Sequence, residues 1–260
     1  WLGHSTVLMR IDQISVLIDP VFTNAAPLPF VVPRFEEPIL ALDDLPEIDL
    51  ILISHDHYDH LDRRSIQHFR DRDTKFIVPL GLSSYLIGWG IEAERIQELD
   101  WWDESSFGGL KIACTPSQHF SGRNGPRGNA TLWASWVVIG EEERFYFSGD
   151  SGYDIHFKQI GDKYGPFDVA FMESGQYNEM WKMSHLHPED TVQASEDIQA
   201  KKIQPIHWGM FTLSTHDWFE PPEQILKGSR DKEFSVLTPV IGERVCPKEQ
   251  QEFSAWWREL

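Results

Sequence analysis

The sequence contains only two cysteines and no long apolar run. Cys114 and Cys246 lie far apart and form no CxxC pair, which excludes a disulfide framework and favours a reducing compartment. No stretch of 18 consecutive apolar residues occurs, so we expect no integral membrane segment. Nothing resembling a signal peptide opens the chain, and we therefore expect a cytoplasmic protein. The chain begins at Trp1 without an initiator methionine, so this expectation leaves open a targeting segment that has been removed.

Basic side chains are also scarce. The 260 residues include 23 Lys and Arg against 41 Asp and Glu, which gives a formal net charge of −18. Such a field repels nucleic acid unless a local basic patch overcomes it. The densest basic stretch, residues 63–75, is interleaved with Asp71 and Asp73. The composition thus predicts no nucleic-acid partner, and it leaves the oligomeric state open.

The length suits one large domain, and no repeat or linker divides it. We therefore expect a single domain over residues 1–260. Short apolar runs that are typical of strands alternate with helical patterns. Strands are predicted over residues 6–11, 14–18, 49–54, 75–79, 110–115, 132–139, 144–147, 167–172, 202–206 and 233–238. Helices are predicted over residues 65–72, 81–88, 188–200 and 221–227. Residues 20–38 contain five prolines and are expected to form a long surface loop.

The chain is rich in histidine, with eleven residues of this type. His55, His57, Asp59 and His60 follow directly on the apolar run 49–54, so a buried strand would carry them at its carboxyl end. Three imidazoles and a carboxylate suit a divalent transition metal. In an extended segment His55 and His57 share one side, and Asp59 and His60 can reach a second ion nearby. A solvated polar loop is the alternative, which the apolar strand before the cluster disfavours.

Three further candidates follow other apolar runs: His119, Asp150 and His207. Taken singly, a His or Asp at a strand end is more often structural. Taken together they gain weight, because parallel strands bring their carboxyl ends to one edge, where α/β proteins place ligands. Five histidines and two aspartates are a ligand set for a two-metal site.

An HxHxDH string followed by separate His, Asp and His residues resembles the metallo-β-lactamase-fold hydrolases. The opening WLGHST at residues 1–6 and the LIDP at residues 17–20 resemble the branch that contains N-acyl-phosphatidylethanolamine-hydrolysing phospholipase D and the ascorbate-6-phosphate lactonase-like proteins. The strings ISHDHYDHLD at residues 53–62 and IHWG at residues 206–209 are similar to the phospholipase D subgroup. This resemblance covers nearly the whole chain. It implies an α/β fold, a four-layer αββα sandwich with two mixed β-sheets.

The resemblance also implies a division of the ligands between two divalent ions. His55, His57 and His119 would hold the first ion. Asp59, His60 and His207 would hold the second, and Asp150 would bridge the two. Zn²⁺ is the first expectation, with Mn²⁺ or iron as alternatives because the ligand set alone does not choose.

Two residues are expected to act in catalysis. Asp59 would hold the nucleophile or take its proton. By the resemblance, His185, which lies before a Pro-Glu pair, would contact the substrate or assist proton transfer. A capping or surface role is the alternative for His185.

The function implied is hydrolysis of an ester bond, with a phosphodiester as first expectation, through a hydroxide that bridges the two ions. The substrate would be a small-molecule or lipid-like ester. A lactonase or another carboxylic ester hydrolase on the same site is the alternative. A di-iron oxidoreductase is disfavoured by His57, where such proteins typically carry Glu. A non-catalytic metal-binding protein is disfavoured by the complete ligand set.

Several residues near these motifs were assigned other roles. The fold implied by the resemblance places His4 near the metals, where we expect a structural role, and His187 is expected to lie outside the site. Asp62 occupies a position where glyoxalase II and lactamase relatives usually carry Gly, which argues against an antibiotic substrate. We interpret Asp62 as a residue that orients a ligating histidine from behind.

Overall fold

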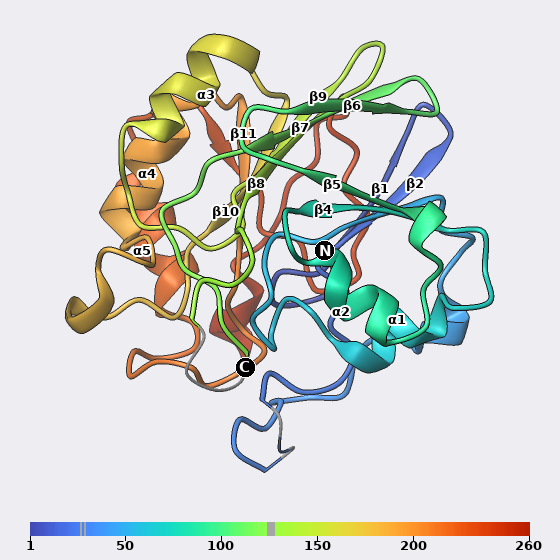
Figure 1. Cartoon of the computed structure of the whole chain (residues 1–260). Coiled ribbons are helices and arrows are strands. Elements are labelled where there is room, and N and C mark those ends of the chain that lie inside the picture. The colour runs from blue at the N-terminus through green and yellow to red at the C-terminus, as the bar shows by residue number, and fades with distance from the viewer. Residues whose placement is uncertain (27, 29, 124–127) are drawn as a thin grey trace.

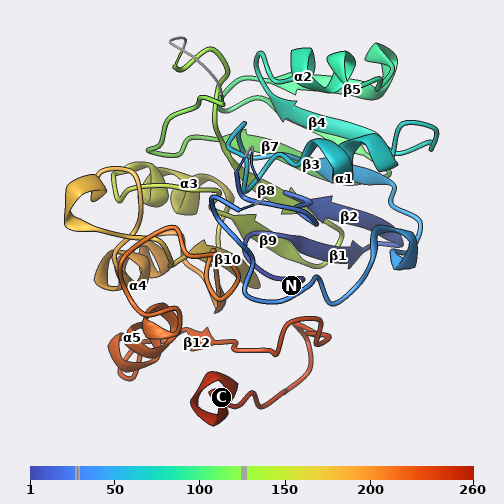
Figure 2. The same cartoon turned by 90° about the horizontal axis from the view of Figure 1, so that it is seen from below.

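The computed structural model describes residues 1–26, 28, 30–123 and 128–260. Two β-sheets face each other, and helices cover their outer faces (Figure 1). The helices α1 (Arg63–His68) and α2 (Ser83–Gly88) lie on one side. The helices α3 (His156–Tyr164), α4 (Pro188–Asp197) and α5 (Glu220–Gly228) lie together on the other, as the turned view also shows (Figure 2). The predicted αββα sandwich is confirmed.

The first sheet has the strand order β1-β2-β3-β4-β5. Its members are β1 (Val7–Ile11), β2 (Ile14–Ile18), β3 (Leu50–Leu52), β4 (Lys75–Pro79) and β5 (Ile96–Leu99). β1 and β2 are antiparallel, and the other neighbours are parallel. Asp12 and Gln13, with φ of 47° and 69°, form the two-residue turn between β1 and β2, because a type I′ hairpin turn needs positive φ at both positions.

The second sheet has the order β12-β11-β10-β9-β8-β7-β6. Its members are β6 (Glu104–Phe107), β7 (Leu110–Thr115), β8 (Ser135–Ile139), β9 (Arg144–Phe147), β10 (Val169–Glu173), β11 (Lys202–Ile206) and β12 (Ser235–Val236). Pairing is antiparallel from β6 to β9 and parallel from β9 to β12. Both sheets are therefore mixed, as expected, and β7, β9, β10 and β11 all end at the same edge.

Alternation along the strands divides the core into layers. In β3, Leu50 and Leu52 face the second sheet, whereas Ile51 packs toward α1 and α2. In β8, Trp136 faces the first sheet and Val137 packs toward the other helices. Successive strand residues point to opposite faces, so each continuously apolar strand is buried on both sides. These buried strands supply rigid ends for the polar residues that follow them.

The sequence pattern did not predict α3, β5 or β6. The strands β5 (IQEL) and β6 (ESSF) are largely polar, because they lie at the edges of their sheets, where apolar residues on both faces are not required. The helix α3 buries Phe157, Ile160 and Tyr164 at helical spacing, but its one-sided pattern is short and includes a glycine. No helix in the described part of the chain is long and apolar enough to cross a bilayer.

Candidate metal centre

The first ligand group forms where β3 and β7 end. The Nε2 atom of His55 lies 2.9 Å from Nδ1 of His57, and that Nδ1 lies 3.2 Å from Nε2 of His119. The Oδ2 atom of Asp150 lies 3.8 Å from both His55 Nε2 and His119 Nε2. The four side chains each offer one ligand atom, and these atoms all lie within 4.8 Å of one another.

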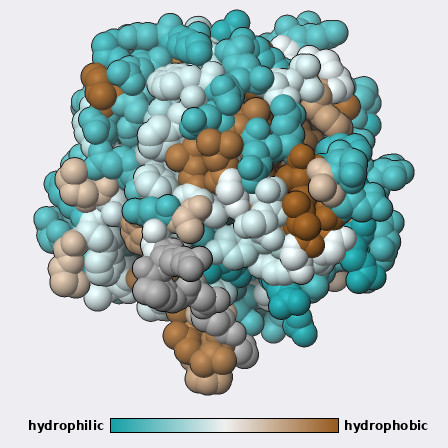
Figure 3. Space-filling view, in the orientation of Figure 1, coloured by the Kyte–Doolittle hydropathy of each residue, from teal (hydrophilic) through white to brown (hydrophobic). Residues whose placement is uncertain are grey.

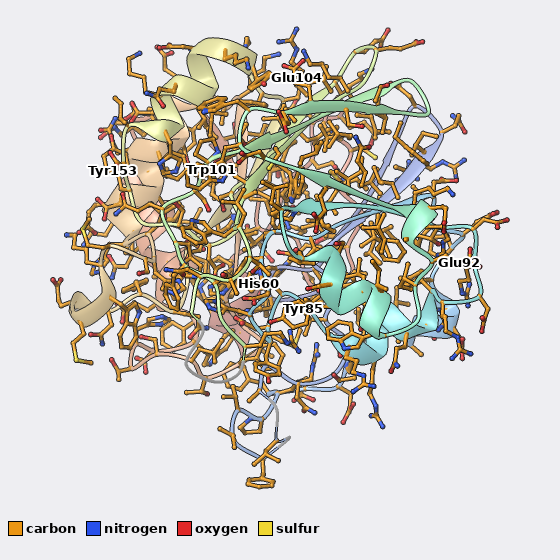
Figure 4. All side chains as sticks on the ribbon, in the orientation of Figure 1. His60, Tyr85, Glu92, Trp101, Glu104 and Tyr153 are labelled. Carbon is orange, nitrogen blue, oxygen red and sulfur yellow. The ribbon has the colours of Figure 1, made fainter. Side chains whose placement is uncertain are left out.

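The second group forms around Asp59. Its Oδ2 atom lies 2.9 Å from His4 Nε2, 3.3 Å from His207 Nε2 and 3.5 Å from His60 Nε2. Asp150 reaches this group as well, because its Oδ1 lies 3.1 Å from His60 Nε2 and its Oδ2 lies 3.1 Å from His207 Nε2. Asp150 therefore lies between the two groups. Figure 4 shows His60 in the interior, between α2 with Tyr85 on one side and the part of the molecule that carries Tyr153 on the other.

The donor atoms are arranged as a cation would require. His57 Nδ1 faces two other ring nitrogens, and one proton cannot satisfy three such atoms at once. Nε2 of His60 and Oδ1 of Asp150 are buried and have no aligned hydrogen-bond partner among the described residues. Buried polar atoms without partners are costly, so a bound cation between these groups accounts for their placement.

Electrostatics favour the metal-binding protonation states of His55, His119 and Asp150. Burial lowers the pKa of His55 and His119 well below the usual value, which keeps both imidazoles neutral. Burial alone raises the pKa of Asp150, but His207 and His60 bring it well below the usual value. Neutral imidazoles and ionised carboxylates are the ligand forms that divalent metals bind. Asp150 and Asp59 instead raise the pKa of His60 and His207 despite burial, so these two imidazoles would release protons on binding a metal. The side chains present therefore fit a divalent metal site.

A layer of hydrogen bonds behind the ligands orients the histidine rings. His60 Nδ1 lies 2.7 Å from Asp19 Oδ2, and His119 Nδ1 lies 2.9 Å from the Ser184 carbonyl. His207 Nδ1 lies 3.3 Å from the carbonyl of Gly175. With Nδ1 held from behind, each ring turns Nε2 toward the centre, which is how metal-ligating histidines are commonly fixed.

The backbone at the site is held in uncommon conformations. His4, Asp19 and His207 have φ of 48°, 43° and 68°, in the left-handed region that non-glycine residues rarely adopt. Such conformations persist where the surroundings determine them, and they cluster at functional sites. Here they turn the chain sharply just after β2 and β11, which brings the side chains of Asp19 and His207 inward.

The structure brings all seven predicted ligands together: His55, His57, Asp59, His60, His119, Asp150 and His207. That each of them binds metal stays a prediction. His185 lies beside both groups, with its ring centroid 5.1 Å from that of His119 and 5.5 Å from that of His207. His187 turns away and packs on Tyr177, at a centroid distance of 5.1 Å.

Sequence reasoning missed two residues of the site. Glu173 ends β10 and contacts His185, and Asp19 follows β2 and contacts His60. The argument from strand ends could have identified both, since each is an acidic residue directly at the end of an apolar run. His4, which is expected near the metals in a structural role, lies in the second group. It sits in a turn before β1, so no strand end marked it.

The interpretation of Asp62 as a residue that orients a histidine is wrong. Its carboxylate caps α1 by accepting from the Arg64 amide at 3.0 Å. It also accepts from the Thr23 amide at 3.0 Å and from the Ser65 hydroxyl at 2.6 Å. Within the described part of the chain its hydrogen-bond partners include no histidine. Asp62 thus anchors the start of the 20–38 loop to α1.

The Asp62→Ala variant should be less stable by about 2 kcal/mol, because it loses a helix cap and leaves part-buried amides without an acceptor. Urea unfolding would measure this change. The metal content should stay that of the parent protein. Asp71→Ala is the matched control, since Asp71 is an exposed carboxylate paired only with Arg70, and its replacement should leave the unfolding midpoint unchanged. Loss of metal from Asp62→Ala would instead show that Asp62 orients a ligating histidine.

Two facing mixed sheets with external helices, and a His/Asp cluster at the strand ends, define a protein of the αββα class with a candidate metal centre. Residues 15–208 match the family model described as the Beta-lactamase superfamily domain. The chain belongs to this family, and it is a metal-dependent hydrolase of the metallo-β-lactamase superfamily. The resemblance carried by the HxHxDH string is confirmed.

Relatives and solved structures agree with this assignment. The chain is 41% identical over 264 residues to Uncharacterized protein Rv0906 of Mycobacterium tuberculosis, which covers 99% of this chain and 71% of the relative. It is 37% identical over 262 residues to N-acyl-phosphatidylethanolamine-hydrolyzing phospholipase D 1 of Caenorhabditis elegans, covering 94% of this chain and 74% of the relative. The structure of Igni18, a metallo hydrolase from Ignicoccus hospitalis, has a TM-score of 0.73 at 22% identity and covers 94% of this chain and 95% of its own. At that identity the likeness shows the fold alone.

Proposed function

We propose that this chain uses two metal ions to hydrolyse a phosphodiester in a phospholipase D-like manner. The observation that carries the proposal is Asp150, whose oxygens lie 3.1 Å from His60 Nε2 and His207 Nε2 and 3.8 Å from His55 Nε2. One carboxylate thus reaches two separate groups of ligands. A carboxylate in this position could offer one ligand to an ion at each group, which is the arrangement that two-metal catalysis uses.

The ligand division follows the two groups. His55, His57 and His119 would hold one ion, Asp59, His60 and His207 would hold the other, and Asp150 would contact both. Imidazole with carboxylate suits Zn²⁺ first, and Mn²⁺ or iron next. When bound, such ions would bring the pKa of water to about 7 and neutralise charge on the attacked ester. Since the two groups draw on both sheets, we treat residues 1–260 as one domain.

Asp59 is the residue that handles the attacking water. His4 lies 2.9 Å from its Oδ2 atom and fixes the carboxylate from the buried side. The Asp59 side chain is 12% exposed, against 2% for Asp150, so it is the carboxylate that water reaches. His207 and His60 hold the pKa of Asp59 well below its usual value despite burial. An ionised Asp59 would accept a hydrogen bond from water and orient it for attack.

Apolar side chains beside the ligands favour a lipid-like ester. Phe120 is 44% exposed and packs its ring against His57 and His119, at centroid distances of 4.8 Å and 4.7 Å. In the 20–38 loop, Phe30 is 76% exposed and Val31 57%. This loop projects from the molecule in Figure 1, and the corresponding end in Figure 3 is coloured as hydrophobic. A hydrogen bond of 2.9 Å from the Phe35 amide to the Met210 carbonyl ties the loop to the segment after His207.

A phosphodiester fits the charge of the site and the name of a relative. Bound divalent ions would give a locally positive site in a chain of net charge −18, which attracts an anionic ester. The same overall charge disfavours a nucleic acid as the phosphodiester. The Caenorhabditis elegans relative carries the name of a phospholipase D that hydrolyses N-acyl-phosphatidylethanolamine.

A substrate panel on the metal-loaded protein tests the proposal. The panel contains N-acyl-phosphatidylethanolamine in detergent micelles, a soluble chromogenic phosphodiester, a lactone and a lactam. We expect kcat/KM for a phosphodiester to exceed that for the lactone and the lactam by at least about tenfold, a difference of about 1.4 kcal/mol in transition-state binding. Faster hydrolysis of the lactone would favour a carboxylic ester hydrolase. Hydrolysis of none of the four would contradict the proposal.

A further inference from the structure

Glu173 is a buried carboxylate that the seven-ligand site does not use. Its side chain is fully buried at the end of β10, and one carboxylate oxygen, Oε1, contacts Nδ1 of His185. The other oxygen, Oε2, accepts a hydrogen bond of 2.7 Å from the Ser151 amide. The Glu173 backbone is fixed as well, because its amide donates to Ser148 Oγ at 2.8 Å and its carbonyl accepts from Thr191 Oγ1 at 3.0 Å.

These bonds decide which nitrogen of His185 carries a proton. The Ser151 amide can only donate, so it keeps Oε2 of Glu173 as an acceptor. When Glu173 is ionised it has no proton to give, and the contact at Oε1 then places a proton on Nδ1 of His185. The lone pair of the neutral ring then belongs to Nε2, on the other side of the imidazole.

The position of His185 makes this choice of nitrogen important. The His185 side chain is 16% exposed, whereas Glu173 is fully buried. Its ring lies 5.1 Å from the ring of His119 and 5.5 Å from that of His207, which are ligands from different groups. A substrate held at both groups would therefore meet the edge of His185 that faces away from Glu173.

We propose that Glu173 is a positioning residue for hydrolysis, which fixes the orientation of His185 and its Nδ1-protonated form so that Nε2 is presented to the substrate. This inference rests on the role of His185 in the proposed function. Glu173 also lies 3.8 Å from His207 Nδ1, but that nitrogen already faces the Gly175 carbonyl at 3.3 Å. The direct partner of Glu173 is therefore His185.

The Glu173→Gln variant is the sharpest change. Its volume is nearly the same, and its amide oxygen keeps the bond from the Ser151 amide. The amide NH₂ must then face His185 Nδ1, which becomes an acceptor, and the ring proton moves to Nε2. We expect kcat to fall by about 10- to 100-fold, with KM changed less than about threefold and metal content unchanged. Glu220→Gln is the matched control, because Glu220 accepts a 2.7 Å hydrogen bond from Tyr177 away from the ligand groups, and its kcat should be that of the parent.

A double-mutant cycle with His185→Ala separates positioning from other roles. If Glu173 acts through His185, then Glu173→Gln should change kcat by less than about twofold once His185 is absent, since coupled residues are not additive. An equal loss in both backgrounds would overturn the proposal. Loss of metal from Glu173→Gln would also overturn it, because Glu173 would then be a ligand or a support for His207. Full activity of His185→Ala would overturn it as well.

A readout without substrate distinguishes failure of this inference from failure of the proposed function. ¹⁵N chemical shifts of the His185 ring, assigned by comparison with His185→Ala, report which nitrogen is protonated. We expect protonated Nδ1 in the parent protein and protonated Nε2 in Glu173→Gln. The same protonated nitrogen in both proteins would overturn the positioning role. If the expected change of nitrogen occurs while no phosphodiester is hydrolysed, the proposed function fails and the structural part of this inference stands.

Discussion

Replacing Asp150 with alanine is expected to lower kcat by a factor on the order of a thousand or more and to remove metal from both ligand groups. Asp150 is 3% exposed, and its two oxygens face histidines of both groups. The variant would leave His60 and His207 without their shared partner, so both ions lose a ligand at once. Mass spectrometry of bound metal, together with kcat for a phosphodiester, measures the change.

Asp162→Ala provides the control for this prediction. Asp162 is an exposed carboxylate on α3 that pairs with Lys158 at 3.2 Å, so its removal should change neither metal content nor kcat. If Asp150→Ala kept about two ions per chain and full activity, Asp150 would not be the bridging ligand. A loss of only one ion, with the other still bound, would restrict Asp150 to a single group.

Removing the metal is expected to lower the melting temperature by about 8–16 °C. A ligand that binds only the folded chain stabilises it by about 4 kcal/mol when its free concentration is a thousandfold above the dissociation constant. In a chain of this size each kcal/mol corresponds to about 2–4 °C. The physical reason is that the buried carboxylates of Asp59 and Asp150 both lie within 3.5 Å of His60 and His207. A bound cation would replace the protons of these histidines as the partner of the two carboxylates.

Thermal unfolding with and without a chelator measures this effect. The Asp150→Ala variant is the matched control, since a chain that binds little metal should show little change on chelation. Equal melting temperatures of the parent protein in the two conditions would contradict a structural contribution of the metal. Recovery of the original value on adding Zn²⁺ would show that the loss is reversible and not aggregation.

Strand ends explain why so much of the site was predictable. A buried apolar run such as residues 49–54 indicates a strand, and the polar residue directly after it must leave the core at a defined edge. This logic located His55, His119, Asp150 and His207 without any knowledge of how the strands pair. The same logic extends to Glu173 and Asp19, because each is an acidic residue at the end of an apolar run, as Asp150 is.

Other features depend on tertiary contacts that the local pattern does not carry. His4 lies in a turn, and it reaches the site through its contact with Asp59 at 2.9 Å and the packing of its ring on His207 at a centroid distance of 4.2 Å. Asp62 sits within the ligand-bearing string, and its proximity to His60 suggested the wrong partner. The Asp62 carboxylate instead accepts from the Arg64 amide, because the amides at the start of a helix need acceptors. The edge strands β5 and β6 were missed since their exposed positions leave little apolar periodicity.

The number of ions per chain tests the central claim most directly. The protein would be saturated with Zn²⁺, freed of loosely bound metal by gel filtration and analysed by mass spectrometry against its measured concentration. Two ligand groups that share Asp150 predict about two ions per chain in the parent protein and a loss from both groups in Asp150→Ala. A value of about one in the parent, unchanged by Asp150→Ala, would contradict a dinuclear site at these residues.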